Sequence, residues 1–415
     1  CSYNSYPAYI PHDGVNVEAR TARKANIAGF PLCKWKGLIS GVLTQKFGLK
    51  KALVPCATSR PYSVYAPAQP KLDCTKTSTM SLSKFAVVGC GRIGQRHIEM
   101  IRNLEHAELV ATCDVRNADE LGLPAGIPHY HSLEALLADH HVDVLAVASP
   151  NGMHAAHALQ GIESGAHVII EKPMALHKSD AERVLHAALQ RGRYVFGVMQ
   201  NRYSPPSEWL KSVVDQGLLG DIFQVHIDCF WNRDDRYYHS GGWHGTKDLD
   251  GGTLFTQFSH FIDILYWVFG DVKPLSALLR NYNHGHSIEF EDTGLVHFAL
   301  PQHGAALGSL NYSTSVWDAN LESSMTIIGS KGSIKVAGQY MNEVVHCHVE
   351  GYTMPELAPS NPPNDYGPYK GSAANHMYVY ENVRDVLRGT KPITTNALEG
   401  LKVVEIIESI YALAR

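Results

Sequence analysis

Between Lys84 and Met199, short runs of β-branched and other apolar residues alternate with amphipathic segments. The apolar runs predict strands at 85–88, 109–114, 142–148, 167–170 and 194–199. Strands that alternate with helices are typical of βαβ units, which build a parallel sheet. Ser179 and Glu182 form an S-x-x-E pattern that predicts a capped helix, and Gly192 predicts its end. We therefore expect an N-terminal Rossmann-type domain with a doubly wound parallel sheet.

After Gln200 the pattern changes, because apolar runs follow one another with few helices between them. These runs predict strands at 223–230, 293–300, 305–312 and 324–328. Consecutive strands favour a large, mostly antiparallel open sheet in a C-terminal α+β domain. Residues 375–415 form two amphipathic segments separated by 389–392, and these last helices can pack back on the first domain. The predicted α/β organisation is a cofactor domain at 80–200 and a second domain at 201–415.

Residues 1–79 differ from the rest of the chain. They carry 11 Lys and Arg against 3 Asp and Glu, and they show no sustained helical or strand period. Three interpretations remain open, namely an organelle transit segment, a disordered tail, or translated upstream sequence. We favour the last two and leave this basic extension out of the fold prediction.

The composition excludes several classes of protein. The net charge is −4, and the excess of acidic residues lies entirely after residue 79, which argues against nucleic-acid binding. No apolar run reaches the ~18 residues that a membrane-spanning helix needs. The eight cysteines show no C-x-x-C pair and no metal-ligand spacing, so we expect no metal site. Reduced thiols fit a cytoplasmic location, and organelle targeting by residues 1–79 is the less favoured alternative.

A G-x-G-x-x-G sequence at 89–94 directly follows a predicted strand and opens a helix. Gly89 permits the tight turn, Gly91 lets a pyrophosphate approach the backbone, and Gly94 lets helix and strand pack closely. Asp114 lies twenty residues further on, where a carboxylate accepts hydrogen bonds from a ribose 2′-hydroxyl and repels a 2′-phosphate. The pattern predicts NAD rather than NADP, although Arg116 could soften that choice. The alternative is a glycine-rich turn in another doubly wound protein.

Two polar segments, at 149–151 and 171–173, also follow apolar strands at the carboxyl edge where such sheets bind ligands. Lys172 in the second segment could donate to a substrate hydroxyl and stabilise the oxygen as hydride leaves the carbon. Pro173 keeps the preceding residue extended, which fixes the direction of the lysine. From position alone, a solvated surface lysine is an equally good interpretation.

A second candidate lies on a predicted helix that ends at Gly270. Its apolar face consists of Leu254, Phe258, Phe261, Leu265 and Val268. Thr256, Gln257, His260 and Asp263 fall on the other side, so this polar stripe must face solvent or a cleft. An imidazole is suited to accept a hydroxyl proton, and Asp263 could orient the ring. The alternative is that His260 is a hydrogen-bonded core histidine.

Polar and aromatic residues cluster in two loops after predicted strands. They are Asn201, Arg202, Tyr203, Asn232, Arg233, Arg236, Tyr237 and Tyr238. Arginine offers a forked set of donors that matches carboxylate or phosphate, and tyrosine can stack on a sugar or a base. The cluster fits an anionic sugar or sugar nucleotide better than a neutral polyol.

Together these features resemble the glucose-fructose oxidoreductase, inositol dehydrogenase and rhizopine catabolism family, abbreviated Gfo/Idh/MocA. The matching motifs are V-V-G-C-G-R-I-G at 87–94, S-P-N-x-x-H at 149–154, E-K-P at 171–173 and G-G-x-L-x-x-Q-x-x-H-x-x-D at 251–263. The resemblance implies an NAD-dependent oxidoreductase in which Lys172 and His260 form the catalytic pair. It also implies a homo-oligomer, either a dimer or a tetramer, assembled through the second domain.

Carried onto this sequence, the resemblance implies two sets of binding residues. The cofactor set is Gly89, Gly91, Arg92, Ile93, Gly94, Asp114, Ser149, Asn151, His154, Glu171 and Lys172. The substrate set is Gln200, Arg202, Tyr203, Trp231, Asn232, Arg233, Gln257 and Asp263. W-N-R at 231–233, Q-N-R-Y at 200–203 and T-Q-F-S-H at 256–260 are most similar to dehydrogenases that oxidise the 3-hydroxyl of UDP-N-acetylglucosaminuronate.

One position departs from the family's inositol dehydrogenases, which carry Asp four residues before the histidine where this chain has Thr256. The sequence therefore predicts no second carboxylate beside the catalytic pair. The alternatives are an inositol or free-sugar dehydrogenase, an NAD-dependent glycosidase of the same family, and a non-catalytic NAD-binding regulator.

Overall fold

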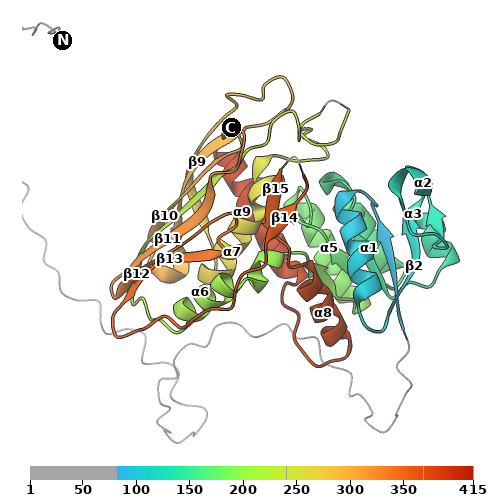
Figure 1. The fold of residues 1–415 in the computed structure, drawn as a ribbon, viewed down its shortest axis with the longest axis horizontal. Helices are drawn as coiled ribbons and strands as arrows, with labels where there is room; N and C mark the ends of the chain where they lie inside the picture. Colours follow the sequence, from blue (N-terminus) through green and yellow to red (C-terminus); the bar gives the residue numbers. More distant parts are fainter. Residues whose placement is uncertain (1–81, 240, 368, 415) are drawn as a thin grey trace, which may run out of the picture. The chain divides into compact units, whose positions relative to one another are not determined.

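The computed structural model describes residues 82–239, 241–367 and 369–414, so the interpretations of residues 1–79 lie outside the described residues. The chain builds two large sheets, which Figure 1 shows with their helices. Sheet A has six strands and precedes residue 200, and sheet B has seven strands and follows it. The predicted fold class is confirmed, while the domain boundaries remain a prediction.

Sheet A is entirely parallel in the order β3-β2-β1-β4-β5-β6. Its strands are β1 (Ser83–Val88), β2 (Ala107–Cys113), β3 (His129–Tyr130), β4 (Val144–Val147), β5 (His167–Ile170) and β6 (Val195–Gly197). The central strands are buried on both faces, which explains why they appear in the sequence as continuous apolar runs. The strand order reverses between β1 and β4, and open sheets of this kind bind ligands at such a switch point.

The helices of this part are α1 (Arg92–Asn103), α2 (Ala118–Leu121), α3 (Leu133–Asp139), α4 (His154–Glu163) and α5 (Lys178–Arg191). Gly192 ends α5 in the left-handed conformation, with φ 61°, as predicted. The predicted capping box was wrong, because His177 is the N-cap residue and Ser179 lies inside the helix. A glutamate far along the chain caps the first turn instead, because the Lys178 N–H donates to Glu408 Oε2 at 3.0 Å.

Sheet B has the order β13-β12-β11-β7-β10-β9-β8, and only the β7–β10 pair is parallel. Its strands are β7 (Ile222–Phe230), β8 (Lys273–Arg280), β9 (Thr293–Leu300), β10 (Ala306–Ser313), β11 (Glu322–Gly329), β12 (Gly332–Ala337) and β13 (Glu343–Val349). Sequence reasoning missed β8, β12 and β13. Both edge strands, β8 and β13, are largely exposed, so they lack the apolar run that identifies a buried strand.

The helices after residue 200 cover the inner face of sheet B and return to sheet A. They are α6 (Pro205–Asp215), the π-helical turn η3 (Leu254–Phe258), α7 (Ser259–Phe269), α8 (His376–Leu387) and α9 (Ala397–Leu413). On the inner face, Phe258 and Phe261 pack edge-on against Trp231, which directly follows β7. Helix α8 contacts α1, and α9 contacts α5, so the C-terminal segment joins the two halves of the protein.

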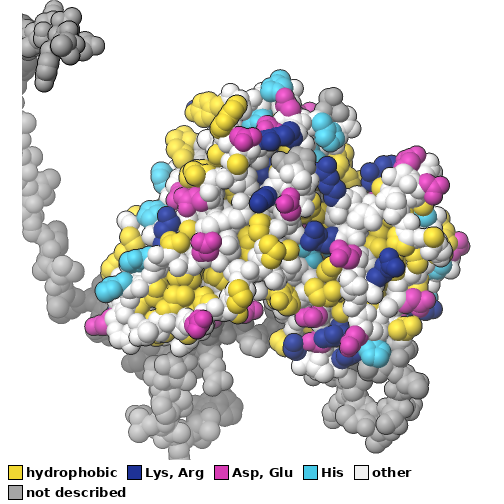
Figure 2. Space-filling view, viewed as in Figure 1, with side chains coloured by type: hydrophobic (Ala, Val, Ile, Leu, Met, Phe, Trp, Pro, Cys, Tyr) yellow, Lys and Arg dark blue, Asp and Glu magenta, His cyan; other side chains and the backbone are white. Residues whose placement is uncertain are grey.

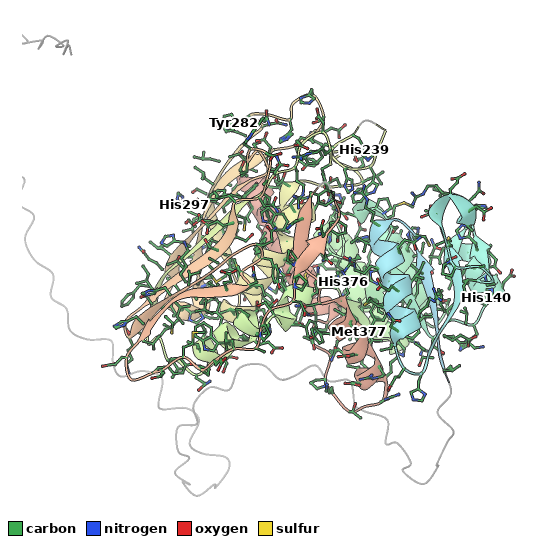
Figure 3. The ribbon with its side chains drawn as sticks, viewed as in Figure 1. His140, His239, Tyr282, His297, His376 and Met377 are labelled. Atoms are coloured by element: carbon green, nitrogen blue, oxygen red, sulfur yellow. The ribbon has the colours of Figure 1, made fainter. Side chains whose placement is uncertain are left out.

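The outer face of sheet B carries no helix among the described residues. Leu278, Leu295 and Leu307 lie on neighbouring strands of this face and are 60%, 49% and 57% exposed. His297 lies on the same face, and Figure 3 shows it on the outer side of the sheet. Figure 2 shows further histidine side chains along this flank.

Within the described ranges, no helix is both long enough and apolar enough to cross a bilayer. The same residues contain no group of three His, Cys, Asp or Glu side chains arranged to hold a metal ion.

Candidate active site

A cavity of about 1530 Å³ opens at the switch point of sheet A and is also lined by residues that follow residue 200. It brings the glycine turn, Lys172 and His260 together in one space. The predicted site residues that line it are Gly89, Gly91, Arg92, Ile93, Asp114, Ser149, Asn151, His154, Glu171, Lys172, Gln200, Trp231, Arg233, Gln257 and His260. Gly94, Arg202, Tyr203, Asn232 and Asp263 do not line it.

The glycine turn between β1 and α1 has the geometry that a dinucleotide needs. A Cβ on Gly89 would lie 2.4 Å from Ser149 N, and a Cβ on Gly94 would lie 1.9 Å from Gly89 O, so neither position accepts a side chain. Gly91 begins α1 without a side-chain cap, and the first turn contains no acidic residue. The helix N-terminus therefore offers N–H groups and a partial positive charge to a pyrophosphate. These residues fit NAD.

Asp114 ends β2 beside this turn. Its Oδ2 accepts a hydrogen bond from Cys90 N at 2.8 Å, and its two oxygens accept from the Arg116 guanidinium at 3.0 and 3.1 Å. Burial alone would raise the pKa of Asp114, but the hydrogen bonds from Arg116 and Cys90 lower it overall. The carboxylate is thus ionised and faces the cavity. The half-exposed Arg116 covers the oxygens that a ribose would use, so it must shift when ribose hydroxyls bind.

Lys172 extends from the end of β5 into the cavity. Its Nζ donates to Thr256 O at 2.6 Å, which brings it to the π-helical turn that precedes His260. Burial lowers the pKa of Lys172, and the negative charges of Glu171 and Asp250 limit that decrease. An ammonium so placed has further N–H groups available for a ligand.

His260 enters the same cavity from the first turn of α7 and is 2% exposed. Its Nδ1 has no hydrogen-bond partner among the described residues. Burial and the positive charge of Lys172 hold the pKa of His260 well below its usual value, so the imidazole is neutral at physiological pH. A neutral, unpartnered imidazole beside an ammonium can accept a proton from a ligand hydroxyl.

Two family models match the chain. The model described as the oxidoreductase family with an NAD-binding Rossmann fold matches residues 83–198, and the Gfo/Idh/MocA C-terminal domain matches residues 208–335. The chain belongs to the Gfo/Idh/MocA family. It is accordingly an NAD-dependent dehydrogenase that acts on CH–OH groups, as the sequence predicted.

Several individual proteins are similar to this Gfo/Idh/MocA member. The WlbA dehydrogenase from Bordetella pertussis, solved in complex with NADH and UDP-GlcNAcA, is 32% identical over 80% of this chain and 96% of its own, with a TM-score of 0.69. The Chromobacterium violaceum WlbA dehydrogenase, solved with the same two ligands, is 31% identical over 81% and 95%, with a TM-score of 0.71. The trans-1,2-dihydrobenzene-1,2-diol dehydrogenase of Macaca fascicularis is 25% identical over 340 residues, which are 79% of this chain and 92% of the relative.

Glu171, which was predicted to bind the cofactor, lines the cavity, and its carboxylate also belongs to a buried network. Glu171 Oε1 lies 3.1 Å from His97 Nε2 and 3.6 Å from His376 Nε2. His97 Nδ1 in turn lies 2.6 Å from the hydroxyl of Tyr380. Burial would raise the pKa of Glu171, but the hydrogen bonds from His376 and His97 hold it well below its usual value. The side chain therefore connects α1 and α8 behind Lys172.

Arg233 lies on the substrate side of the cavity and is 2% exposed. Its hydrogen-bond acceptors in the described part of the chain are Gln257 Oε1, Asn320 Oδ1 and the carbonyl oxygens of Asn232 and Lys370. All of these acceptors are neutral. The guanidinium also lies 4.8 Å from the ring centroids of Trp231 and Tyr369 and 5.4 Å from that of Tyr237. Arg233 is thus a buried cation held by aromatic faces and amides, without a carboxylate partner in that set.

The structure corrects the prediction that Arg202 and Asp263 contact substrate. Arg202 is 1% exposed and donates to both carboxylate oxygens of Asp263, at 2.8 and 2.6 Å, and to Glu399 at 2.8 Å. Asp263 is therefore committed to an ion pair and does not orient His260. Neither residue of the pair lines the cavity. The second carboxylate that binds Arg202, that of Glu399, comes from α9, so the sequence of residues 200–203 alone could not reveal it.

Tyr203 and Asn232 also lie outside the cavity. Tyr203 stacks on Tyr378, with 5.9 Å between ring centroids, and burial raises the pKa of its hydroxyl to about 12. Asn232 holds the loop after β7, because its side chain donates to Val316 O at 2.7 Å and accepts from Arg236 at 3.0 Å. Both side chains support the walls of the site without facing it.

Several cavity residues escaped sequence reasoning. Tyr366 and Tyr369 come from the hairpin of β14 (Pro363–Asp365) and β15 (Lys370–Ala373), and His376 opens α8, where Figure 3 labels it. His244 comes from a loop after β7. The hairpin and α8 lie far along the chain from the recognised motifs, whereas His244 lies between two recognised segments, after Tyr238 and before Gly251. Only their aromatic and histidine content hinted at a role.

Proposed function

We propose that this enzyme oxidises a secondary hydroxyl of an anionic sugar nucleotide, the 3-hydroxyl of a UDP-N-acetylhexosaminuronate, with NAD as the hydride acceptor. The observation that carries the proposal is the buried charge of Arg233. Burying a guanidinium without a counter-ion is costly, and a carboxylate or phosphate on the substrate would supply the missing negative charge. A neutral polyol would leave that cost in place.

The unpartnered polar atoms of the cavity favour a sugar. Gln200 Oε1, Asn364 Oδ1 and the Nδ1 atoms of three histidines, 244, 260 and 376, are buried without a hydrogen-bond partner among the described residues, and all five residues line the cavity. Buried polar atoms are normally hydrogen-bonded, so these atoms identify positions where a ligand would donate or accept. A molecule with several hydroxyl groups matches this distribution.

The volume of the cavity agrees with two ligands of this size. Small-molecule sites usually occupy roughly 300–1,000 Å³, whereas this cavity measures about 1530 Å³. NAD would occupy the part beside the glycine turn and Asp114. The sugar nucleotide would occupy the remaining part, with Arg233 and the hairpin tyrosines.

In the proposed reaction, NAD held by the glycine turn and Asp114 would supply the hydride acceptor for the carbon that carries the hydroxyl. His260 accepts the hydroxyl proton, because its imidazole is neutral and buried. Lys172 donates a hydrogen bond to the same oxygen and stabilises the negative charge that develops there. The second carboxylate of the inositol-type arrangement is absent from position 256, so these two residues share the proton transfer and the charge stabilisation.

The comparisons support this substrate class without identifying the substrate of this chain. The two WlbA dehydrogenases, at 31–32% identity, were solved with UDP-GlcNAcA. Free sugars and inositols remain the alternative dehydrogenase substrates. A glycosidase of the same family is the other alternative, and it would form product without net NADH.

The test is NADH formation by the purified enzyme over a matched panel. The panel contains UDP-N-acetylglucosaminuronate, UDP-N-acetylglucosamine, myo-inositol and free glucuronate, each with NAD and with NADP. We expect the uronate nucleotide with NAD to give the highest kcat/KM. An equal or higher value for UDP-N-acetylglucosamine, myo-inositol or free glucuronate would contradict the proposal, and product without NADH would favour the glycosidase.

We also propose that the outer face of sheet B assembles the homo-oligomer. Leu278 pairs with Leu295 across β8 and β9, and both are about half-exposed, as is Leu307 on β10. An exposed apolar row of this kind is typical of a contact surface. Light scattering should give a mass above that of one chain, and Leu295→Glu should lower it to the monomer mass. A monomeric native protein would contradict the proposal.

A further inference from the structure

Asp250 is a buried carboxylate that the sequence motifs did not include. It is 1% exposed and directly precedes the glycine pair that leads into η3. Its Oδ2 accepts from the N–H of Gly245 at 2.8 Å, and its Oδ1 accepts from the hydroxyl of Thr256. Among the described residues, the one ionisable cationic group within ion-pair distance is His244, at 3.8 Å, which is charged only when protonated. In the described part of the chain, the negative charge of Asp250 is therefore stabilised by neutral donors.

Thr256 connects this carboxylate to the active site. Its hydroxyl contacts Asp250 and also accepts from Asn151 Nδ2 at 2.7 Å, while its carbonyl oxygen accepts from Lys172 Nζ at 2.6 Å. Inositol-type relatives place a carboxylate at position 256 itself. Here the carboxylate lies behind Thr256, on a residue six positions earlier in the chain.

We propose that Asp250 is a positioning residue of the hydride-transfer site. Its carboxylate, held against Thr256, keeps Lys172 in the ammonium form and holds η3 where Lys172 can contact it. The inference rests on the proposed role of Lys172, because Asp250 itself does not line the cavity. Asp250 would thus supply, through space, the negative charge that a carboxylate at position 256 would otherwise supply.

The groups that act on Lys172 explain why Asp250 matters. Glu171 and Asp250 favour its charged form, whereas burial and the positive charge of Arg233 disfavour it. His260 faces the same space and is neutral. Glu171 already interacts with two imidazoles, His97 and His376, which offset part of its charge. Asp250 lies near one imidazole, that of His244 at 3.8 Å, and adds a second, smaller negative charge that favours the ammonium.

The substitution Asp250→Asn keeps the shape of the side chain and removes its charge. The pKa of Lys172 should then fall further, so that more of the amine is neutral at a given pH. The basic limb of the pH profile of kcat/KM should move to lower pH. Asp292→Asn is the matched control, because Asp292 is a fully buried aspartate that holds the turn at 282–284 and does not line the cavity.

The deciding experiment measures the amine directly and needs neither NAD nor substrate. Cyanate carbamylates only neutral amines, and peptide mass spectrometry can follow Lys172 against the exposed Lys273 in the same sample. Relative to Lys273, we expect carbamylation of Lys172 at pH 8 to be roughly tenfold faster in D250N than in the native enzyme, because more of the amine is then neutral. Asp250→Glu should restore the native rate, and D292N should not change it.

An unchanged rate in a D250N protein with native circular dichroism would overturn the proposal. If D250N does not fold, the pH dependence of carbamylation in the native enzyme decides, because a Lys172 that is mostly neutral at pH 7 would equally overturn it. Failure of the proposed function would appear separately, as an absence of turnover on the uronate nucleotide with a normal carbamylation result.

Discussion

Arg202 and Arg233 are two arginines buried to nearly the same extent, with 1% and 2% of their surface exposed. Arg202 lies in the packed region between η2 (Gln200–Tyr203), α7 and α9, where Asp263 and Glu399 neutralise it. Arg233 lies in the cavity region, where amides, carbonyls and aromatic rings hold it. The first region is complete without a ligand. The second region carries a positive charge that an anionic ligand can satisfy.

The contrast shows that burial and residue type do not distinguish a structural arginine from a binding one. What distinguishes them is the charge of the partners that other parts of the chain supply. Lys172 belongs with Arg233, because it also lines the cavity and has no carboxylate within ion-pair distance among the described residues. Variants in the cavity region should therefore change the activity, whereas variants in the packed region should change the stability.

The largest effect is expected from the cavity region. Lys172→Ala and His260→Ala should each reduce kcat by roughly 10³-fold or more, since each removes a proton-transfer or charge-stabilising group. Tritiated or fluorescent NADH binding should remain near the native value, because neither change alters the glycine turn. Turnover within a few-fold of the native enzyme in either variant would contradict the assignment.

The next largest effect is expected from the packed region. Arg202→Met removes one partner of a buried ion pair and leaves Asp263 unpaired, which should cost about 3–5 kcal/mol in the free energy of unfolding measured with urea. The double variant Arg202→Met with Asp263→Leu removes both charges and should recover most of that loss. A single variant as stable as the native protein would show that the pair is not structural.

A smaller effect is expected at Asp114. Asp114→Ala removes the acceptor for ribose hydroxyls and frees Arg116, which can then pair with a 2′-phosphate. The ratio of kcat/KM for NAD to that for NADP should fall by about tenfold or more, as expected for the loss of one charge-assisted contact. Steady-state kinetics with both cofactors measure the ratio, and Asp119→Ala on the exposed α2 is a control that should not move it.

The smallest expected effect concerns the pH profile of the native enzyme. The pKa of His260 lies well below 6.5, so the imidazole accepts a proton above that pKa and loses this ability as the pH falls through it. The acid limb of the kcat/KM profile should consequently lie below pH 6.5, the ordinary value for histidine. An acid limb at or above 6.5 would indicate that a different group, or a protonated His260, controls the reaction.

Much of the fold could be predicted because the buried strands of sheet A are apolar throughout and end in recognisable polar motifs. β5 matched its predicted range residue for residue, and Gly192 ended α5 as its position implied. β8 and β13 could not be found, since edge strands bury too few side chains to show a pattern.

The candidate site was predictable only where its residues belong to a local motif. The shared cavity of Lys172 and His260 follows from a sheet edge and a helix, each visible in the sequence. The partners of three buried residues could not be recognised in the sequence. Arg202 pairs with Glu399 of α9, and Glu171 contacts histidines of α1 and α8. Asp250 contacts Thr256 of the π-helical turn. Contacts between distant segments decide which polar residues face the cavity.

The most direct test of the central claim compares two substrates on two enzymes. The substrates are UDP-N-acetylglucosaminuronate and UDP-N-acetylglucosamine, which differ in the carboxylate, and the enzymes are the native protein and Arg233→Met. We predict that the native enzyme prefers the uronate by roughly 100-fold in kcat/KM, the scale of one charged contact left unpaired. Arg233→Met should lose most of this preference. An equal preference in both enzymes would contradict the account, because Arg233 would then play no part in recognising the carboxylate.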